Sequence, residues 1–89
     1  MRVANIVVET QPGKAQAVAE LIGGLRGVEL HAVEDDHRVL ATWSFPEGQH
    51  PEPEGMTEVL QAMTGAILGV ALVEEEERDE MADAIDTTR

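Results

Sequence analysis

The residues best suited to metal binding or proton transfer are three histidines that lie far apart in the sequence. His31 falls in an alternating apolar and polar stretch, His37 in an acidic turn and His50 in a proline-rich segment. None has a second histidine or a cysteine at the close spacing that zinc sites use. We therefore expect no metal site and interpret the three imidazoles as solvent-exposed side chains.

Nucleophilic side chains are also scarce. The chain has no cysteine, and its one serine, Ser44, has no evident base or orienting group. Gly23 and Gly24 fall late in an expected helix, whereas a phosphate-binding loop directly follows a strand. Carboxylates are plentiful, but nothing indicates that one is desolvated enough to hold a proton near neutral pH. The sequence thus predicts a protein that is not an enzyme and binds no cofactor.

Acidic residues dominate the charge of the chain. Eighteen Asp and Glu stand against six Lys and Arg, for a formal net charge of −12. Because such a chain repels phosphate backbones and anionic lipid, we expect no nucleic-acid partner and no membrane insertion. A cationic partner is favoured, although the acidity could also serve solubility alone. We also expect a soluble cytoplasmic protein. The chain has no cysteine and no signal-like segment after Met1, and its longest apolar run, 66–73, is too short to span a bilayer.

Hydrophobic periodicity predicts four strands and two helices. Thr10 or Gln11 is expected to cap the first helix, with Pro12 in its first turn and Gly27 at its end. The prolines and glycines of 46–55 indicate a loop. The expected strands are 3–9, 28–33, 38–45 and 66–73; the first helix includes Ala15, Val18, Ala19, Ile22 and Leu25, and the second includes Met56, Val59, Leu60 and Met63.

The element order β-α-β-β-α-β is typical of the split βαβ, or ferredoxin-like, α+β fold. Right-handed crossovers then give a four-stranded antiparallel sheet of order 4-1-3-2 with both helices on one face. We assign residues 1–73 to this domain and expect 74–89 to form an acidic tail that is disordered or loosely helical. The side chains expected to face the helices are Ala4, Ile6, Val8, Leu30, Val39, Ala41, Trp43, Leu68, Val70 and Leu72.

The other face of the sheet is expected to stay open. Its small side chains leave a shallow trough in which an amphipathic helix could rest, or the face could close a homodimer. Carboxylates gather at both rims, where they could pair with arginines or remain solvated. The open face is expected to carry Asn5, Val7, Glu9, His31, Leu40, Thr42, Ser44, Gly69, Ala71 and Val73; one rim carries Glu9, Glu34, Asp35 and Asp36, and the other carries Glu47, Glu52, Glu54 and 74–77.

Three segments carry a resemblance to a known family. The stretches N-I-V-V-E-T-Q-P-G-K-A (5–15), L-R-G-V-E-L-H-A (25–32) and A-I-L-G-V-A-L-V (66–73) resemble the NapD family of cytoplasmic chaperones. The resemblance covers residues 4–73 and implies the ferredoxin-like fold. It also implies a chaperone that binds the twin-arginine signal peptide of the periplasmic nitrate reductase catalytic subunit and delays its export until the cofactors are inserted.

Carried over to this chain, the resemblance implies a set of peptide contacts on three strands. We expect two carboxylates, Glu9 and Glu74, to bind the arginines. The chain departs from the family pattern after Val73, where two glutamates stand, and in the long loop 46–55. The other expected contacts are Asn5 and Val7, Leu40 and Thr42, and Ala71 and Val73.

Two other functions use related folds. A dimeric small-molecule-sensing regulatory domain of the βαββαβ type needs a glycine-containing turn after the first strand, which Pro12-Gly13 supplies, and a stable dimer. We expect instead a monomer or weak dimer. A dimeric cofactor-free oxygenase needs a roomy cavity with aromatic or histidine side chains, and one Trp and one Phe argue against it.

Overall fold

The computed structural model describes residues 1–46 and 52–77 and contains the expected six elements. Hydrogen bonding orders the strands β2-β3-β1-β4, and every neighbouring pair is antiparallel. This is the predicted 4-1-3-2 sheet in reverse order. In chain order the elements are β1 (Arg2–Thr10), α1 (Ala15–Ile22), β2 (Val28–Glu34), β3 (Arg38–Phe45), α2 (Pro53–Met63) and β4 (Ile67–Glu77).

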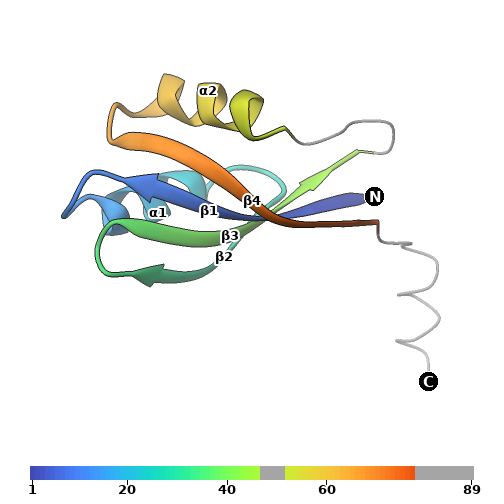
Figure 1. The fold of residues 1–89 in the computed structure, drawn as a ribbon, viewed down its shortest axis with the longest axis horizontal. Coiled ribbons are helices and arrows are strands. Elements are labelled where there is room, and N and C mark those ends of the chain that lie inside the picture. Colours follow the sequence, from blue (N-terminus) through green and yellow to red (C-terminus); the bar gives the residue numbers. More distant parts are fainter. Residues whose placement is uncertain (47–51, 78–89) are drawn as a thin grey trace.

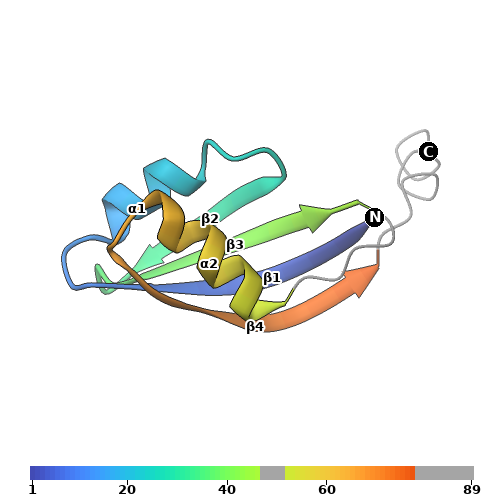
Figure 2. The same cartoon turned by 90° about the horizontal axis from the view of Figure 1, so that it is seen from above.

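Both helices pack on the same side of the sheet, as Figures 1 and 2 show, and the chain has the predicted ferredoxin-like α+β fold. Alternate residues of β1 and β3 face the helices, because successive strand side chains point to opposite faces. Burying aliphatic side chains of this kind contributes about 1.5–3 kcal/mol each. The core between sheet and helices consists of Ala4, Ile6, Val8, Ala15, Val18, Ala19, Ile22, Val39, Ala41, Met56, Leu60 and Ile67.

The register of β4 corrects one expectation. Leu68 was expected to face the helices, but it is 59% exposed, and Ile67 takes the buried place at 3%. The pairing with β1 shifts at this point, since Thr10 lies opposite Ile67 and Glu9 opposite Gly69. The extra residue is a β-bulge, which interrupts the two-residue alternation.

The end of β4 corrects another expectation. The tail was predicted to begin at Glu74, but the strand continues to Glu77 along the first residues of β1. Arg2 stabilises this extension through ion pairs with Glu75 at 3.0 Å and Glu77 at 3.2 Å. An acidic sequence therefore forms a strand because β1 supplies both backbone partners and a cation. The remainder of the expected tail, 78–89, lies outside the described residues.

Helix α1 is shorter than predicted at both ends. Lys14, not Thr10 or Gln11, precedes its first residue, and the helix ends at Ile22, with Gly23 as its C-cap, before the predicted stop at Gly27. The helix starts later than predicted because the backbone carbonyl of Asp36, in the β2–β3 turn, accepts hydrogen bonds from the N–H groups of Gly13 and Ala15. These bonds hold 11–14 as a turn, in which Gly13 has a φ of 81°.

Helix α2 begins inside the segment predicted to be a loop. Pro53 occupies its first turn, where the missing N–H of proline carries no cost. Met56 and Leu60 are buried as expected, whereas Val59 and Met63 are 50% and 37% exposed. Glu47 and His50, part of the expected loop, lie outside the described residues.

Candidate functional site

The sheet face opposite the helices, which we call the open face, is covered by no helix among residues 1–46 and 52–77 (Figures 1 and 2). Strand pairing arranges its side chains in rows that run across the strands, since directly paired residues share a face. The rows alternate in character along the strands. An apolar row contains Ala32, Leu40, Val7 and Ala71; a polar row contains Glu29, Thr42, Asn5 and Glu74; and a charged row contains Glu34, Arg38 and Glu9.

The apolar row is a low, lightly covered strip. Val7 and Leu40 are half-buried in the central strands, and Ala32 and Ala71 are exposed at the two edges. Because the two alanines are short, the larger side chains of Val7 and Leu40 remain accessible to a partner that lies on the open face. The strip therefore offers apolar contact without forming an enclosed cavity.

A hydrogen-bonded chain of side chains lies along the polar row. The hydroxyl of Thr42, which is 8% exposed, donates to Oδ1 of Asn5 at 2.8 Å. Nε2 of His31 lies 2.5 Å from the same Thr42 oxygen. Because the hydroxyl hydrogen is engaged with Asn5, the imidazole nitrogen donates to Thr42. These two hydrogen bonds fix the orientation of all three side chains on the open face.

His31 reaches the hydroxyl of Thr42 because β2 contains a bulge. The pairing of β2 with β3 shifts between Leu30 and Ala32, so His31 is an extra residue in the ladder. Its Nδ1 lies 4.0 Å from Oε1 of Glu29. The sequence places His31 on this face by alternation, but it gives no sign of the bulge or of Glu29 as a neighbour.

Carboxylates stand at both ends of the polar row. Glu29 on β2 has a side chain that is 78% exposed, and Glu74 on β4 is also exposed. Within the described part of the chain Glu74 makes no ion pair, because the cation at this end, Arg2, faces the helix side with Glu75 and Glu77. Among the described residues, Glu74 is therefore left without a cationic partner.

Glu9 has a different environment. Its carboxylate lies 3.6 Å from Nδ1 of His37, and Arg38 is its cross-strand neighbour. Arg38 reaches Asp35 at 3.5 Å and has a buried Nε with no hydrogen-bond partner among the described residues. The rim on which acidic residues were expected to gather thus also contains His37 and Arg38, which lie beside Glu9.

The structure brings most of the expected contact residues together. Val73 stands at the second register shift of β4 and is 67% exposed. Glu9 is separated from Asn5 by about 13 Å along β1, at ~3.3 Å per residue. The residues that lie in the two adjacent rows are Asn5, Val7, Leu40, Thr42, Ala71 and Glu74.

Within the described ranges the molecule has neither a metal-binding cluster nor a membrane-spanning helix. Residues 1–46 and 52–77 contain no group of three His, Cys, Asp or Glu side chains able to hold a metal ion. In the same ranges, no helix has the length and apolar character needed to cross a bilayer. Comparisons with known protein families, curated proteins and solved structures find no match to this chain.

Proposed function

We propose that this protein is a non-catalytic, cytoplasmic chaperone that binds the twin-arginine signal peptide of the catalytic subunit of the periplasmic nitrate reductase. The observation that carries the proposal is the pairing of an apolar row with a polar row that ends in two exposed carboxylates, all on an uncovered sheet face. The choice of this client rests on the resemblance to NapD chaperones of three segments, 5–15, 25–32 and 66–73.

The two rows match the two parts of such a peptide. An amphipathic helix can lay its apolar side across Val7, Leu40 and Ala71. The arginines that precede the apolar part then reach the carboxylates at the ends of the polar row. Guanidinium–carboxylate pairs are charge-assisted and often bidentate, so they fix the direction of the peptide as well as adding affinity.

We assign the arginine contacts to Glu74 and, in addition, to Glu29. The two residues are separated by three inter-strand spacings, about 14 Å at ~4.8 Å each. Two long arginine side chains that diverge from neighbouring positions can approach such a pair from the middle of the face. Glu9 is a weaker choice than Glu74, because His37 and Arg38 already surround it.

The fixed side chains of the polar row would then act as hydrogen-bonding partners for the peptide. Asn5 has an amide group that can still donate, since its Oδ1 is the atom bonded to Thr42. Binding at this face would cover the twin-arginine motif. Because export signals are read by receptors, a covered motif delays transport while the client is completed.

Chemical-shift mapping tests the location of the proposed site. Addition of the unlabelled signal peptide to the ¹⁵N-labelled chain is expected to shift the amides of Asn5, Val7, Leu40, Thr42 and Ala71, with little change along α1 and α2. Shifts confined to the helices, or their absence at millimolar peptide, would contradict the proposed site.

One observation favours a second function, the dimeric small-molecule sensor. Gly13 has a φ of 81° in the turn after β1, as a glycine-containing ligand turn requires. That function needs a stable dimer, so light scattering at micromolar concentration separates the two. A monomer supports the chaperone, and a dimer of fixed mass supports the sensor.

A further inference from the structure

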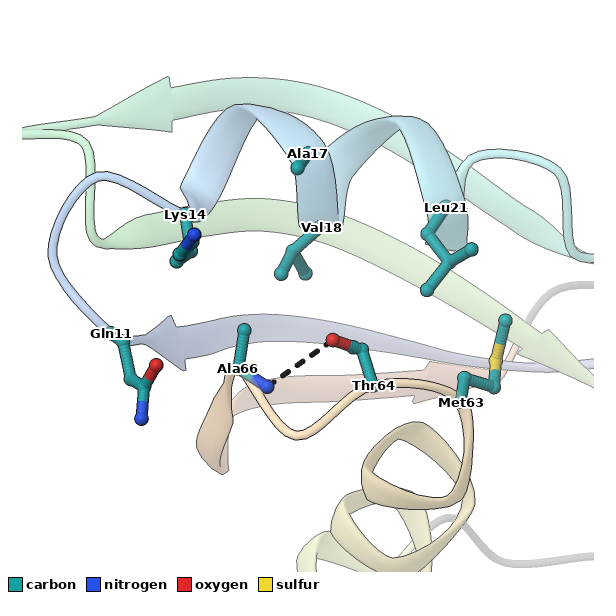
Figure 3. A pocket seen from close by; sticks show the side chains of 8 residues that line it. All are labelled: Gln11, Lys14, Ala17, Val18, Leu21, Met63, Thr64 and Ala66. Atoms are coloured by element: carbon teal, nitrogen blue, oxygen red, sulfur yellow. Dashed lines mark hydrogen bonds between the residues drawn. The ribbon is translucent and has the colours of Figure 1, made fainter.

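A groove lies on the helix side of the molecule, away from the open face. It runs between α1 and the segment that joins α2 to β4, and its volume is about 510 Å³. Figure 3 shows Val18 and Leu21 of α1 pointing toward Met63 and Thr64. This volume lies in the range of about 300–1,000 Å³ typical of small-molecule sites.

One end of the groove is apolar. Leu21 and Met63 face each other across it and are 42% and 37% exposed. Val18 forms part of the wall and is buried, and Ala17 and Ala66 add small side chains. Two large apolar side chains left accessible at a concave surface gain free energy when an apolar group covers them.

The other end carries polar groups, and one of them is cationic. Lys14 and Gln11 line it, whereas Thr64 lies beyond Ala66, next to Met63 (Figure 3). Thr64 Oγ1 accepts a hydrogen bond from the N–H of Ala66 at 3.2 Å, which leaves its hydroxyl hydrogen for another acceptor. Lys14 is the one lysine of the sequence, and within the described residues it makes no ion pair.

The unpaired state of Lys14 is informative because the chain has a net charge of −12 and acidic residues abound. Helix α1 also has no acidic residue in its first turn and no side-chain cap. The N–H of Ala15 nevertheless bonds to the carbonyl of Asp36, so the ammonium group of Lys14 is the cationic group that lines the groove.

We propose that this groove binds a small amphiphilic carboxylate, such as a medium-chain monocarboxylic acid. The carboxylate pairs with Lys14, where Gln11 adds a hydrogen-bond donor. The apolar body lies along α1 and ends between Leu21 and Met63. Leu21 lies seven positions after Lys14 in the sequence, which corresponds to an axial length of about 10 Å.

The charge of the site selects this ligand class. A cationic amphiphile is repelled by Lys14, and a polyanion is repelled by the acidic surface of the rest of the chain. A ligand with a single negative charge and a short apolar body can pair with Lys14 at one end of the groove and contact Leu21 and Met63 at the other. Since the groove and the open face are on opposite sides of the sheet, this inference does not depend on the proposed function.

Octanoate is a suitable probe, with octanol and octylammonium as matched ligands of the same chain length. Titration of the ¹⁵N-labelled protein with octanoate is expected to shift the amides of 14–21 and 63–66 in a saturable manner. Octanol is expected to bind about fivefold more weakly, since it lacks the charge, and octylammonium more weakly still.

Two variants separate the polar from the apolar contribution. Lys14→Gln is expected to weaken octanoate binding about fivefold and leave octanol binding unchanged. Arg26→Gln is the matched control, because Arg26 is also without an ion pair among the described residues but does not line the groove. Leu21→Ser is expected to weaken both ligands, and its exposure makes it compatible with folding.

Several results would overturn the inference. Equal binding of octanoate and octanol would show a site without charge recognition. Shifts that map to the open face, or that depend on protein concentration without ligand, would show another site or a second copy of the chain in the groove. Absence of saturable shifts at millimolar octanoate would show that the groove has no ligand of this class.

Discussion

Thr42 is the residue on which the organisation of the open face depends. Its nearly buried hydroxyl connects His31 to Asn5, so that one oxygen orients two side chains. The neighbouring acids, Glu29 and Glu74, have no comparable restraint and are exposed. The polar row therefore combines a hydrogen-bonded centre with exposed carboxylates at its ends, which suits recognition of a peptide with long cationic side chains.

Replacement of Thr42 by valine tests this centre. Thr42→Val keeps the shape of the side chain but leaves Oδ1 of Asn5 and Nε2 of His31 without their shared partner. We expect a loss of about 1–2 kcal/mol in the free energy of unfolding, measured by urea denaturation. Ser44→Ala, on the same face of β3, is the control and should change stability by less than about 0.5 kcal/mol. Equal effects of the two substitutions would contradict the role given to Thr42.

The charged ends of the row are tested by an isosteric double substitution. Glu29→Gln with Glu74→Gln removes both charges and keeps the shape of the side chains. We expect the affinity for the signal peptide to fall about tenfold, measured by calorimetry. Glu58→Gln, an exposed acid of α2 on the other side of the sheet, is the control. A double variant that binds like this control would remove the carboxylates from the proposed site.

Alternation along the strands was enough to predict which side chains share the open face. It placed Asn5, Val7, Leu40, Thr42 and Ala71 together, and the strand pairing confirms their common face. The hydrogen bonds of His31 could not be predicted, because they depend on a bulge at one position of an edge strand. The proximity of His37 and Arg38 to Glu9 was also missed, since these two side chains come from the hairpin turn and its next residue.

Among the elements, the turn that joins α1 to β2 depends on a single glycine. Gly27 has a φ of 87°, and a Cβ placed on it would lie 3.1 Å from the backbone oxygen of Ser44. The carbonyl of Gly27 also accepts a hydrogen bond from the N–H of Ser44 at 2.8 Å, so the backbone cannot move away without losing this contact. Gly27, the last residue before β2, is thereby fixed against β3.

Substitution of this glycine by alanine tests the arrangement. Gly27→Ala is expected to destabilise the fold by about 1–3 kcal/mol, because it combines a left-handed conformation with a close backbone contact. A fall of roughly 4–8 °C in Tm per kcal/mol would accompany it in thermal unfolding. Gly24→Ala is the control, since its nearest contact would be 3.6 Å and its φ is not positive. A Gly27 variant as stable as this control would contradict the role of the turn.

The order and type of the elements followed from the sequence, while their ends did not. Strand and helix patterns depend on which side chains must be buried, and these are local properties of the chain. The start of α1 instead depends on the Asp36 carbonyl, and the length of β4 depends on Arg2 and the backbone of β1. Contacts of this kind join segments far apart in sequence, so periodicity carries no information about them.

At the scale of the whole molecule, charge and shape divide the surface into two sides. The open face presents an apolar strip beside carboxylates, and the helix side presents a groove lined by Lys14, which makes no ion pair within residues 1–46 and 52–77. A cationic peptide is attracted to the molecule as a whole, because the net charge is −12. The short-range contacts of the open face then select the peptide that also has an apolar segment.

The long-range part of this attraction predicts a dependence on salt. Raising the ionic strength from about 0.05 M to about 0.5 M shortens the screening length severalfold, and we expect the affinity for the signal peptide to fall at least about tenfold. Calorimetry or fluorescence anisotropy at several salt concentrations measures this effect. An affinity that stays constant over the same range would contradict the assignment of carboxylates as arginine partners.

The most direct test of the account is a calorimetric titration of the full chain with the twin-arginine signal peptide of the periplasmic nitrate reductase. A matched peptide in which alanine replaces both arginines is titrated under the same conditions. We predict micromolar or tighter binding of the first peptide, or roughly −8 kcal/mol. We predict binding at least about tenfold weaker for the second. Equal affinity for the two peptides, or no binding of either at several temperatures, would contradict the proposal that the open face recognises twin arginines.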